Sequence, residues 1–374
     1  MDADETLVII DDSERSADLY YATRFAVSSK VVYVESAGRK TLIVSDLEYG
    51  RARAEAAVDE VVPSRAFEDA LRSEGRGATL AGVVDLYLRP RGVREIVVPA
   101  ATALGIAEQL RGLGYALRVC EEPVFPQRAV KTGEEIRAIE EVQGLAEAAM
   151  GLVADMLAGS EIRDDVLYLE GSVLTSERVR KEVRKFLCDK DCSAAHTIVA
   201  GGDQAADPHA LGSGPLPAHR TIVVDILPRS ERTRYWGDMT RTFVRGRVSS
   251  EVRRLHAGVL EAQELALGLV RDGAEAQAVH DAVVRFFERA GHANGEASGK
   301  KTGFIHATGH GVGLEPHEPP RVGRTKAKLA AGQVVAIEPG LYYPGVGSVR
   351  IEDTVVVTRE GHRNLNRFPK RLEL

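Results

Sequence analysis

The chain is 374 residues long, enough for two domains with a core each. Apolar residues make up 44% and charged residues 28%, as in ordinary globular proteins, so the composition excludes a disordered chain. The 49 basic and 55 acidic residues give a net charge of −6, and without a long cationic run this balance argues against a nucleic-acid partner.

The first residues, Met1 to Glu5, are acidic where a secretory signal needs a basic and then an apolar stretch. No window of the sequence is apolar over a membrane-spanning length. We therefore expect a cytoplasmic protein with no membrane partner. The cysteines, Cys120, Cys188 and Cys192, are odd in number, and we expect ordinary thiols rather than a disulfide framework.

The first third of the chain alternates short β-rich runs with helical stretches, a pattern that indicates an α/β domain. Two prolines, Pro123 and Pro126, then break the pattern, because proline removes a backbone donor and disfavours helix in the residue before it. We place a domain boundary here and expect domains at 1–125 and 126–374. The strands expected in the first domain are Leu7–Ile10, Val31–Glu35, Thr41–Ser45 and Glu95–Val98.

A long helix should follow the boundary. Thr132 and Glu135 fit a capping box, and apolar residues then recur at three- and four-residue steps up to Gly159. Similar helical stripes occupy 179–187 and 255–266. Strands mixed with segregated helices predict an α+β second domain with a largely antiparallel sheet. Its expected strands are Thr197–Ala200, Thr221–Ile226, Thr240–Val244, Val334–Glu338 and Ser348–Val357.

Acidic residues accompany these apolar strands at four places. One such residue is usually a salt-bridge partner or a strand-end cap, because a buried carboxylate without a partner costs several kcal/mol. Four together favour divalent cations as the neutralising charge, and they carry enough negative charge for two ions. The four residues are Asp225, Asp238, Glu338 and Glu352.

Histidines near glycine and proline turns would supply nitrogen ligation. His310 lies between two glycines in the run Gly309–Glu318, and His209, His306 and His317 also lie beside such turns close to the strand ends. Oxygen-rich ligation with one imidazole suits Mn²⁺ or Co²⁺, while Zn²⁺ or Fe²⁺ would also be compatible. We expect structural roles for the remaining histidines, His196, His219, His256, His280, His292 and His362.

In this order the acidic residues and His310 resemble the pita-bread metallopeptidases, which include methionine aminopeptidases, Xaa-Pro aminopeptidases, prolidases and the metal-free creatinases. The family's five ligands run Asp, Asp, His, Glu, Glu, and the flanks Gly-His-Gly, Ile-Glu-Pro-Gly and Arg-Ile-Glu-Asp also match. The resemblance extends from about Lys131 to the end, and the preceding segment is similar to the creatinase/prolidase N-terminal domain. The matching ligand positions are Asp225, Asp238, His310, Glu338 and Glu352.

The resemblance implies a role for each of these residues. Asp238 and Glu352 would bridge two ions, Asp225 would chelate one of them, and His310 and Glu338 would hold the other. The ions would activate the attacking water and polarise the scissile carbonyl. Glu338 would also serve as the proton shuttle.

Further residues match positions around the family's substrate. His209 corresponds to the histidine near the scissile nitrogen, and His317 to the one that hydrogen-bonds the developing oxyanion. Arg321 stands where some prolidases grip the substrate carboxylate, a planar group that a guanidinium fork suits. His306, Tyr235 and Arg350 complete the expected substrate-binding residues.

The large N-terminal domain and the motif around His317 favour the prolyl-cleaving members. The resemblance therefore implies an Xaa-Pro aminopeptidase or dipeptidase acting on short peptides, and it implies a homodimer. Asp225 and Asp238 lie 13 positions apart, two more than is usual in the family, so residues 228–234 should form a longer hairpin turn near the pocket. Two alternatives remain, namely the same metal chemistry on non-prolyl peptides or another amide, and a catalytically silent binding protein.

Overall fold

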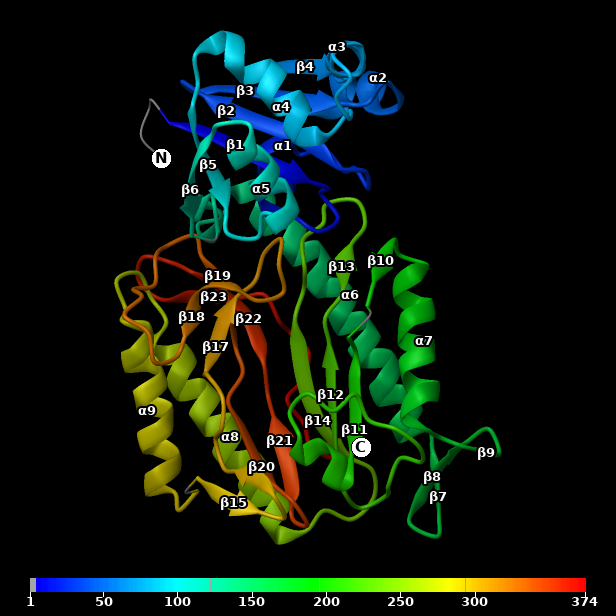
Figure 1. The fold of residues 1–374 in the computed structure, drawn as a ribbon. Helices are drawn as coiled ribbons and strands as arrows, with labels where there is room; N and C mark the ends of the chain where they lie inside the picture. Colours follow the sequence, from blue (N-terminus) through cyan, green and yellow to red (C-terminus); the bar gives the residue numbers. More distant parts are fainter. Residues whose placement is uncertain (1–4, 122, 195, 293) are drawn as a thin grey trace. The chain divides into compact units, whose positions relative to one another are not determined.

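The structure, a computed structural model, describes residues 5–121, 123–194, 196–292 and 294–374. The acidic start Met1 to Asp4, and Glu122 in the boundary segment, lie outside these residues. The chain divides into two compact units, Met1–Arg128 and Ala129–Leu374, and this division falls three residues after the boundary expected from the sequence (Figure 1). Within the described ranges, no helix combines the length and the apolar character needed to cross a membrane.

Unit 1 contains one six-stranded mixed sheet in the order β4-β3-β2-β1-β5-β6. The first three strands pair antiparallel, and the others join the sheet in parallel. All four expected strands are confirmed, whereas β4 and β6 were not predicted because neither carries a buried apolar run. The strands are β1 (Thr6–Asp11), β2 (Val31–Ser36), β3 (Arg39–Val44), β4 (Glu60–Pro63), β5 (Glu95–Pro99) and β6 (Ala116–Cys120).

Helices cover both faces of this sheet. Because side chains alternate between faces along a strand, Val8 and Ile10 of β1 belong to the core under α3, α4 and α5, while Leu7 and Ile9 belong to the core under α1 and α2. The α/β prediction for this domain is thereby confirmed. The helices are α1 (Ala17–Thr23), α2 (Asp46–Glu55), α3 (Arg65–Ser73), α4 (Leu80–Leu88), η1 (Arg89–Arg91) and α5 (Leu104–Gly112), and η2 (Pro126–Ala129) follows at the division between the units.

Unit 2 contains two main sheets, one of three strands and one of five, and each ladder between its described strands is antiparallel, as predicted. The three-stranded sheet consists of β11 (Ile198–Gly201), β12 (Thr221–Ile226) and β14 (Met239–Val244). The five-stranded sheet consists of β18 (Glu318–Val322), β17 (Gly309–Gly311), β19 (Val334–Ile337), β22 (Asp353–Val357) and β23 (His362–Asn364). Smaller sheets pair β7 (Glu161–Arg163), β8 (Val166–Leu169) and β9 (Ser172–Val173); β10 (Cys192–Ser193) and β13 (Arg229–Ser230); β15 (Gly295–Ala297) and β16 (Lys300–Thr302); and β20 (Gly340–Tyr343) and β21 (Gly347–Arg350).

Two pairs of helices flank these sheets, one pair on each side in Figure 1. Helices α6 and α7 pack on the three-stranded sheet, and α8 and α9 pack on the five-stranded sheet. The predicted capping box at Thr132 and Glu135 is present, and α6 ends at Gly159 as expected. The helices are α6 (Gly133–Ala158), α7 (Ser176–Cys188), η3 (Gly202–Ala206), α8 (Ser250–Leu269) and α9 (Ala276–Arg289).

One expected strand is divided in the structure. The sequence predicts a single strand at Ser348–Val357, but β21 ends at Arg350 and β22 begins at Asp353. The division follows from pairing, because β21 pairs with β20 while β22 pairs with β19 in the five-stranded sheet. Glu352 therefore lies where the chain passes from one sheet to another.

Candidate metal centre

The four acidic residues and His310 come together where strands of the two main sheets of unit 2 begin or end. Asp225 lies in β12, and Asp238 directly precedes β14, both in the three-stranded sheet. His310 lies in β17 and Glu338 directly follows β19, both in the five-stranded sheet. Glu352 occupies the break between β21 and β22. Strand ends from both sheets thus deliver ligand atoms to one place.

Distances between these side chains are those of atoms that could share a cation. His310 Nε2 lies 3.7 Å from Asp238 Oδ2 and 3.6 Å from Glu338 Oε1. Three groups of donor atoms have all their members within 4.8 Å of one another, and Asp238, His310 and Glu352 each belong to two of them. The groups are Asp225 with Asp238 and Glu352, His310 with Glu338 and Glu352, and Asp238 with His310 and His317.

The carboxyl groups are held in an environment that opposes their ionisation. Burial raises the pKa of Asp225, and it raises those of Asp238 and Glu352 well above the ordinary range, with repulsion from neighbouring carboxylates adding to the shift of the last two. Burial likewise raises the pKa of Glu338 to about 7. Arg350 acts in the opposite direction on all four, because its guanidinium is buried beside them. One arginine against four acids leaves an excess of negative charge that divalent cations would neutralise.

Two details of hydrogen bonding fit a cation at this position. His310 Nδ1 lies 3.1 Å from the carbonyl oxygen of Gly311, which only accepts, so Nδ1 carries the proton and Nε2 presents a lone pair to the carboxylates. Burial lowers the pKa of His310 to about 3, which keeps the ring neutral. Asp225 Oδ1 is buried and has no hydrogen-bond donor among the described residues. A metal ion would satisfy such an acceptor.

Buried polar side chains hold the centre from behind. Arg350 donates to Asp225 Oδ2 at 2.6 Å, and the Thr240 hydroxyl donates to Glu352 Oε2 at 2.7 Å. Gln143 in α6 pairs with the main chain of Asp238, accepting from its N–H and donating to its carbonyl, both at 2.9 Å. The sequence reasoning missed Gln143 and Thr240. A polar residue in phase with the apolar face of α6 was the available signal for Gln143.

The centre forms the floor of a cavity of about 790 Å³ within unit 2. The expected catalytic residues His209 and His317 line it, as do His306, Arg321 and Arg350. Apolar side chains contribute a further part of the wall, namely Ile198, Leu211, Leu227 and Ile305. His196, which we expected to be structural, also lines the cavity.

Not every expected substrate residue presents a free polar group to this cavity. Tyr235 is buried outside the lining, where its hydroxyl donates to Glu135 Oε1 at 2.7 Å, so the structure places it in the support of α6. His306 uses both ring nitrogens, because Nδ1 donates to the Ala307 carbonyl at 2.7 Å and Nε2 lies 2.9 Å from the Tyr342 hydroxyl. Arg350 lines the cavity, and its guanidinium donates to Asp225 Oδ2 at 2.6 Å and to the Tyr342 hydroxyl at 3.1 Å.

The longer hairpin turn packs away from the cavity. Residues 229 and 230 form β13, which pairs with β10, and Arg232 makes an exposed ion pair with Glu141 of α6. No described residue of 228–234 belongs to the cavity lining. The two extra residues of this turn therefore leave both Asp225 and Asp238 in the centre. The described charged side chains of the turn do not line the cavity.

The raised pKa of Glu338 predicts how the stability of the chelated protein depends on pH. Glu338 ionises near its ordinary value in the unfolded chain and near pH 7 in the fold, so the folded protein binds the extra proton between these values. The stability contributed by that proton is lost as the pH rises toward 7, and bound divalent ions should restore it. We expect the difference in melting temperature between Mn²⁺-loaded and chelated protein to widen from pH 5 to pH 8, and to widen less in Glu338→Gln. A difference independent of pH would contradict this linkage.

Comparisons with known proteins agree with this geometry. Residues 137–359 match the model of Metallopeptidase family M24, and residues 5–130 match that of the Creatinase/Prolidase N-terminal domain. A Xaa-Pro dipeptidase of Pyrococcus horikoshii is 27% identical over 89% of this chain and 85% of its own length. One from Pyrococcus furiosus is 32% identical over 66% of this chain and 65% of its own. The solved Xaa-Pro dipeptidase of Bacillus anthracis, 24% identical, shares the fold with a TM-score of 0.83, over 99% of this chain and 95% of that chain.

Proposed function

Because the chain belongs to metallopeptidase family M24 and carries a creatinase/prolidase N-terminal domain, we propose that it is a metal-dependent peptidase that hydrolyses the N-terminal Xaa-Pro bond of short peptides. The observation that supports this proposal is the cluster of four acids and His310 around one buried centre, with a histidine lone pair and an Asp225 oxygen that has no donor among the described residues. A binding protein without activity would have no need to keep such a costly cluster of carboxylates.

Two divalent ions, Mn²⁺ or Co²⁺, would occupy the centre. Asp238 and Glu352, the carboxylates that each belong to two of the three groups of donor atoms, would contribute to holding both ions; Asp225 would hold one of them, and His310 and Glu338 the other. When bound, the ions would supply activation of water and polarisation of the scissile carbonyl. Zn²⁺ or Fe²⁺ would be compatible with the same donors.

The residues of this chain perform the remaining work. Glu338, whose pKa is raised by burial, would hold and pass on the proton between the attacking water and the leaving nitrogen. His209 at the rim would contact the scissile nitrogen, and His317 would donate to the oxyanion that develops on the carbonyl. His306, fixed by the Tyr342 hydroxyl, would form a neutral wall of the substrate pocket.

We also propose that residues 126–374 form the catalytic domain and residues 1–125 the N-terminal domain, an assignment supported by the two family matches. In this proposal the protein acts in the cytoplasm as a homodimer. Size-exclusion chromatography with light scattering measures the assembly directly, and a monomer at assay concentrations would contradict that part.

The function is tested by assaying Mn²⁺-loaded protein on Xaa-Pro dipeptides, Xaa-Pro-Xaa tripeptides and matched Xaa-Ala peptides. Cleavage confined to the bond before proline, abolished by chelation and restored by Mn²⁺, supports the proposal. Equal cleavage of the alanine peptides would indicate a peptidase without proline preference. Two bound ions without hydrolysis of any peptide would indicate a binding protein.

Arg321 should decide how long the substrate may be. Its exposed side chain lines the cavity beyond His317, where a guanidinium would meet the carboxylate of a dipeptide. We expect Arg321→Ala to lower kcat/KM for Xaa-Pro dipeptides by about ten- to over a hundredfold, the value of a charge-assisted pair, and to spare tripeptides.

The matched control is Arg324→Ala, which removes an exposed arginine three positions later that does not line the cavity. Equal losses on both substrate lengths in Arg321→Ala would mean that this residue does not read the carboxylate, and the aminopeptidase form of the function would then be favoured.

A further inference from the structure

Behind the metal centre, the main chain of Glu352 is held by a buried arginine. Arg241 of β14 is 1% exposed and uses all five of its N–H groups. One nitrogen, Nη1, donates to the carbonyl oxygen of Glu352 at 2.6 Å and to that of Thr240 at 2.9 Å. The other nitrogens reach Asp353 Oδ1 at 2.8 Å and the carbonyl oxygens of Phe368 at 2.9 Å and Pro369 at 3.3 Å.

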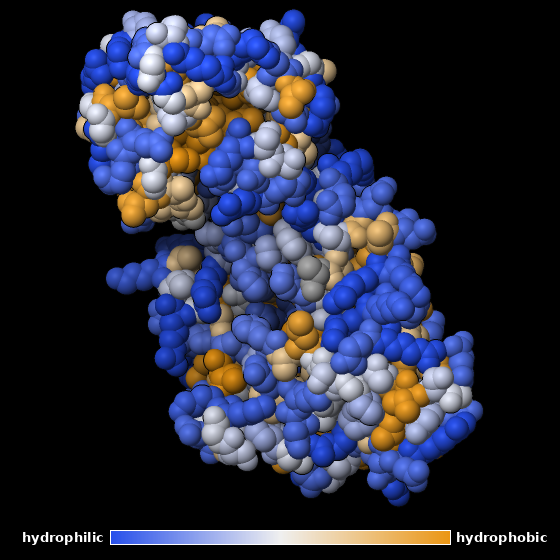
Figure 2. All heavy atoms as spheres, turned by 45° about the vertical axis from the view of Figure 1, so that its right-hand side comes forward, coloured by the Kyte–Doolittle hydropathy of each residue, from blue (hydrophilic) through white to orange (hydrophobic). Residues whose placement is uncertain are grey.

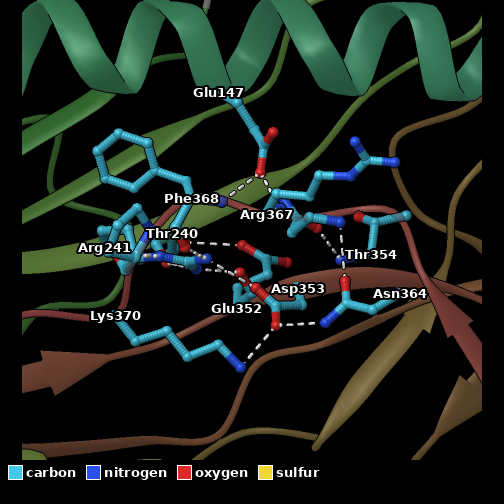
Figure 3. A network of polar contacts seen from close by, with 12 residues as sticks. Glu147, Thr240, Arg241, Glu352, Asp353, Thr354, Asn364, Arg367, Phe368 and Lys370 are labelled. Atoms are coloured by element: carbon cyan, nitrogen blue, oxygen red, sulfur yellow. Dashed lines mark hydrogen bonds and ion pairs between the residues drawn. The ribbon is translucent and has the colours of Figure 1, made fainter.

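Asp353 fixes the direction of this guanidinium, as Figure 3 shows. Its Oδ1 accepts from Arg241, while its Oδ2 accepts from Asn364 at 2.8 Å and from Lys370 at 2.7 Å. The Asp353 side chain is only 1% exposed, and both of its carboxylate oxygens accept hydrogen bonds from protein donors. A carboxylate so paired cannot turn without leaving buried donors unsatisfied.

The segment Asn366–Leu374, called here the closing segment, carries the remaining acceptors. Glu147 of α6 accepts from the main-chain N–H groups of Arg367 and Phe368, which holds the start of the segment (Figure 3). Farther along, Leu372 accepts from the N–H of Val244 at 2.8 Å at the end of β14. The carbonyls of Phe368 and Pro369, which accept from Arg241, thus lie in a segment that hydrogen bonds hold on both sides.

We propose that Arg241 is a positioning residue that aims the Glu352 carboxylate at the metal centre. Glu352 lies at the break between two described strands. Its N–H donates to the Thr240 carbonyl at 3.1 Å, and its own carbonyl accepts from Arg241. The Thr240 hydroxyl holds the side chain of Glu352 by donating a hydrogen bond to its Oε2 atom. The inference rests on the proposed function, in which Glu352 bridges two ions.

Holding the Glu352 carbonyl in this way requires the fork shape of the arginine side chain and not only its positive charge. A lysine keeps the positive charge but offers three donors on a flexible stem, so it cannot serve five acceptors in fixed directions. Outer partners of metal ligands typically change metal affinity or activity by about 10–100-fold when replaced. We therefore expect Arg241→Lys to weaken binding of both Mn²⁺ ions, which Glu352 would share, by about 10–100-fold and to lower kcat, with little change in KM.

In the experiment, chelated full-length protein is titrated with Mn²⁺. Calorimetry measures the binding of each ion, and the EPR signal of coupled Mn²⁺ pairs reports when both sites are filled. Arg245→Lys is the matched control, because Arg245 directly follows the same strand and donates to the carbonyl oxygens of Ser160 and Leu374, and none of its described hydrogen bonds involves a proposed ligand. It should lower the melting temperature without changing either Mn²⁺ affinity. Asp353→Asn keeps the shape at its position and should act in the direction of Arg241→Lys.

The outcomes distinguish a failure of the proposed function from a failure of the positioning role. Wild-type protein that binds fewer than two Mn²⁺ ions overturns the proposed function. Wild-type protein that binds two, with unchanged affinities in Arg241→Lys and Asp353→Asn, overturns the positioning role. If neither variant folds while Arg245→Lys does, the network is scaffold only and the positioning role is withdrawn.

Discussion

Asp238→Ala should abolish hydrolysis and leave a protein that cannot hold a pair of divalent ions. Asp238 lies within reach of donors on both sides of the centre, 3.7 Å from His310 Nε2 on one side and grouped with Asp225 and Glu352 on the other. Its loss would remove a ligand from both ions and leave their like charges less shielded. Peptide turnover should fall to the chelated background at every Mn²⁺ concentration tested.

Metal content after dialysis and turnover at saturating Mn²⁺ measure this effect, with Asp272→Ala as a control that removes an exposed acid elsewhere in unit 2. Asp238→Asn tests the charge alone, because it keeps the shape of the side chain. A fully loaded Asp238→Ala protein with wild-type kcat would remove this residue from the ligand set.

His317→Ala should keep two bound ions and lose most of its turnover. The side chain lines the cavity with its ring 4.3 Å from that of His310, which places a donor beside the centre. A group that stabilises charge only in the transition state lowers kcat when removed and changes KM little. The loss of one such donor typically costs about 10²–10³ in kcat.

A second histidine on the same cavity wall gives the control. His196→Ala should change kcat much less, because His196 belongs to none of the three groups of donor atoms. His317 does belong to one, with Asp238 and His310. If His317→Ala releases an ion, its role is that of a ligand, and if it raises KM with kcat unchanged, its role is ground-state binding.

Local signals explain which elements could be predicted from the sequence. Helix α6 begins and ends at the expected residues because the capping box at Thr132 and the stop at Gly159 act within a few positions. The four acids were recognisable because carboxylates at apolar strand ends are costly without a partner. These features need no knowledge of the rest of the fold.

Features that depend on distant partners could not be predicted in the same way. Ser348–Val357 has the composition of one strand, and it divides only because β20 and β19 pair with its two halves. The placement of Tyr235 depends on Glu135, a hundred positions earlier in the chain. Arg241 reaches acceptors more than a hundred positions later, so its burial has no local signature.

Most of the face seen in Figure 2 is hydrophilic, with apolar residues in scattered patches and a larger band on unit 1. Exposed apolar side chains of that unit include Leu47, which is 90% exposed, and Leu104, which is 72% exposed. Single exposed residues of this kind are common on folded proteins.

The ligand donors come from both sheets of unit 2, and this origin has a mechanical consequence. Asp225 and Asp238 belong to the half with α6 and α7, whereas His310 and Glu338 belong to the half with α8 and α9. Ions held between them would act as cross-links between residues that lie 72 to 113 positions apart in the chain, and such links lower the entropy of the unfolded chain. Loading with metal would thereby fasten the two halves into a single cooperative unit, which chelation would release.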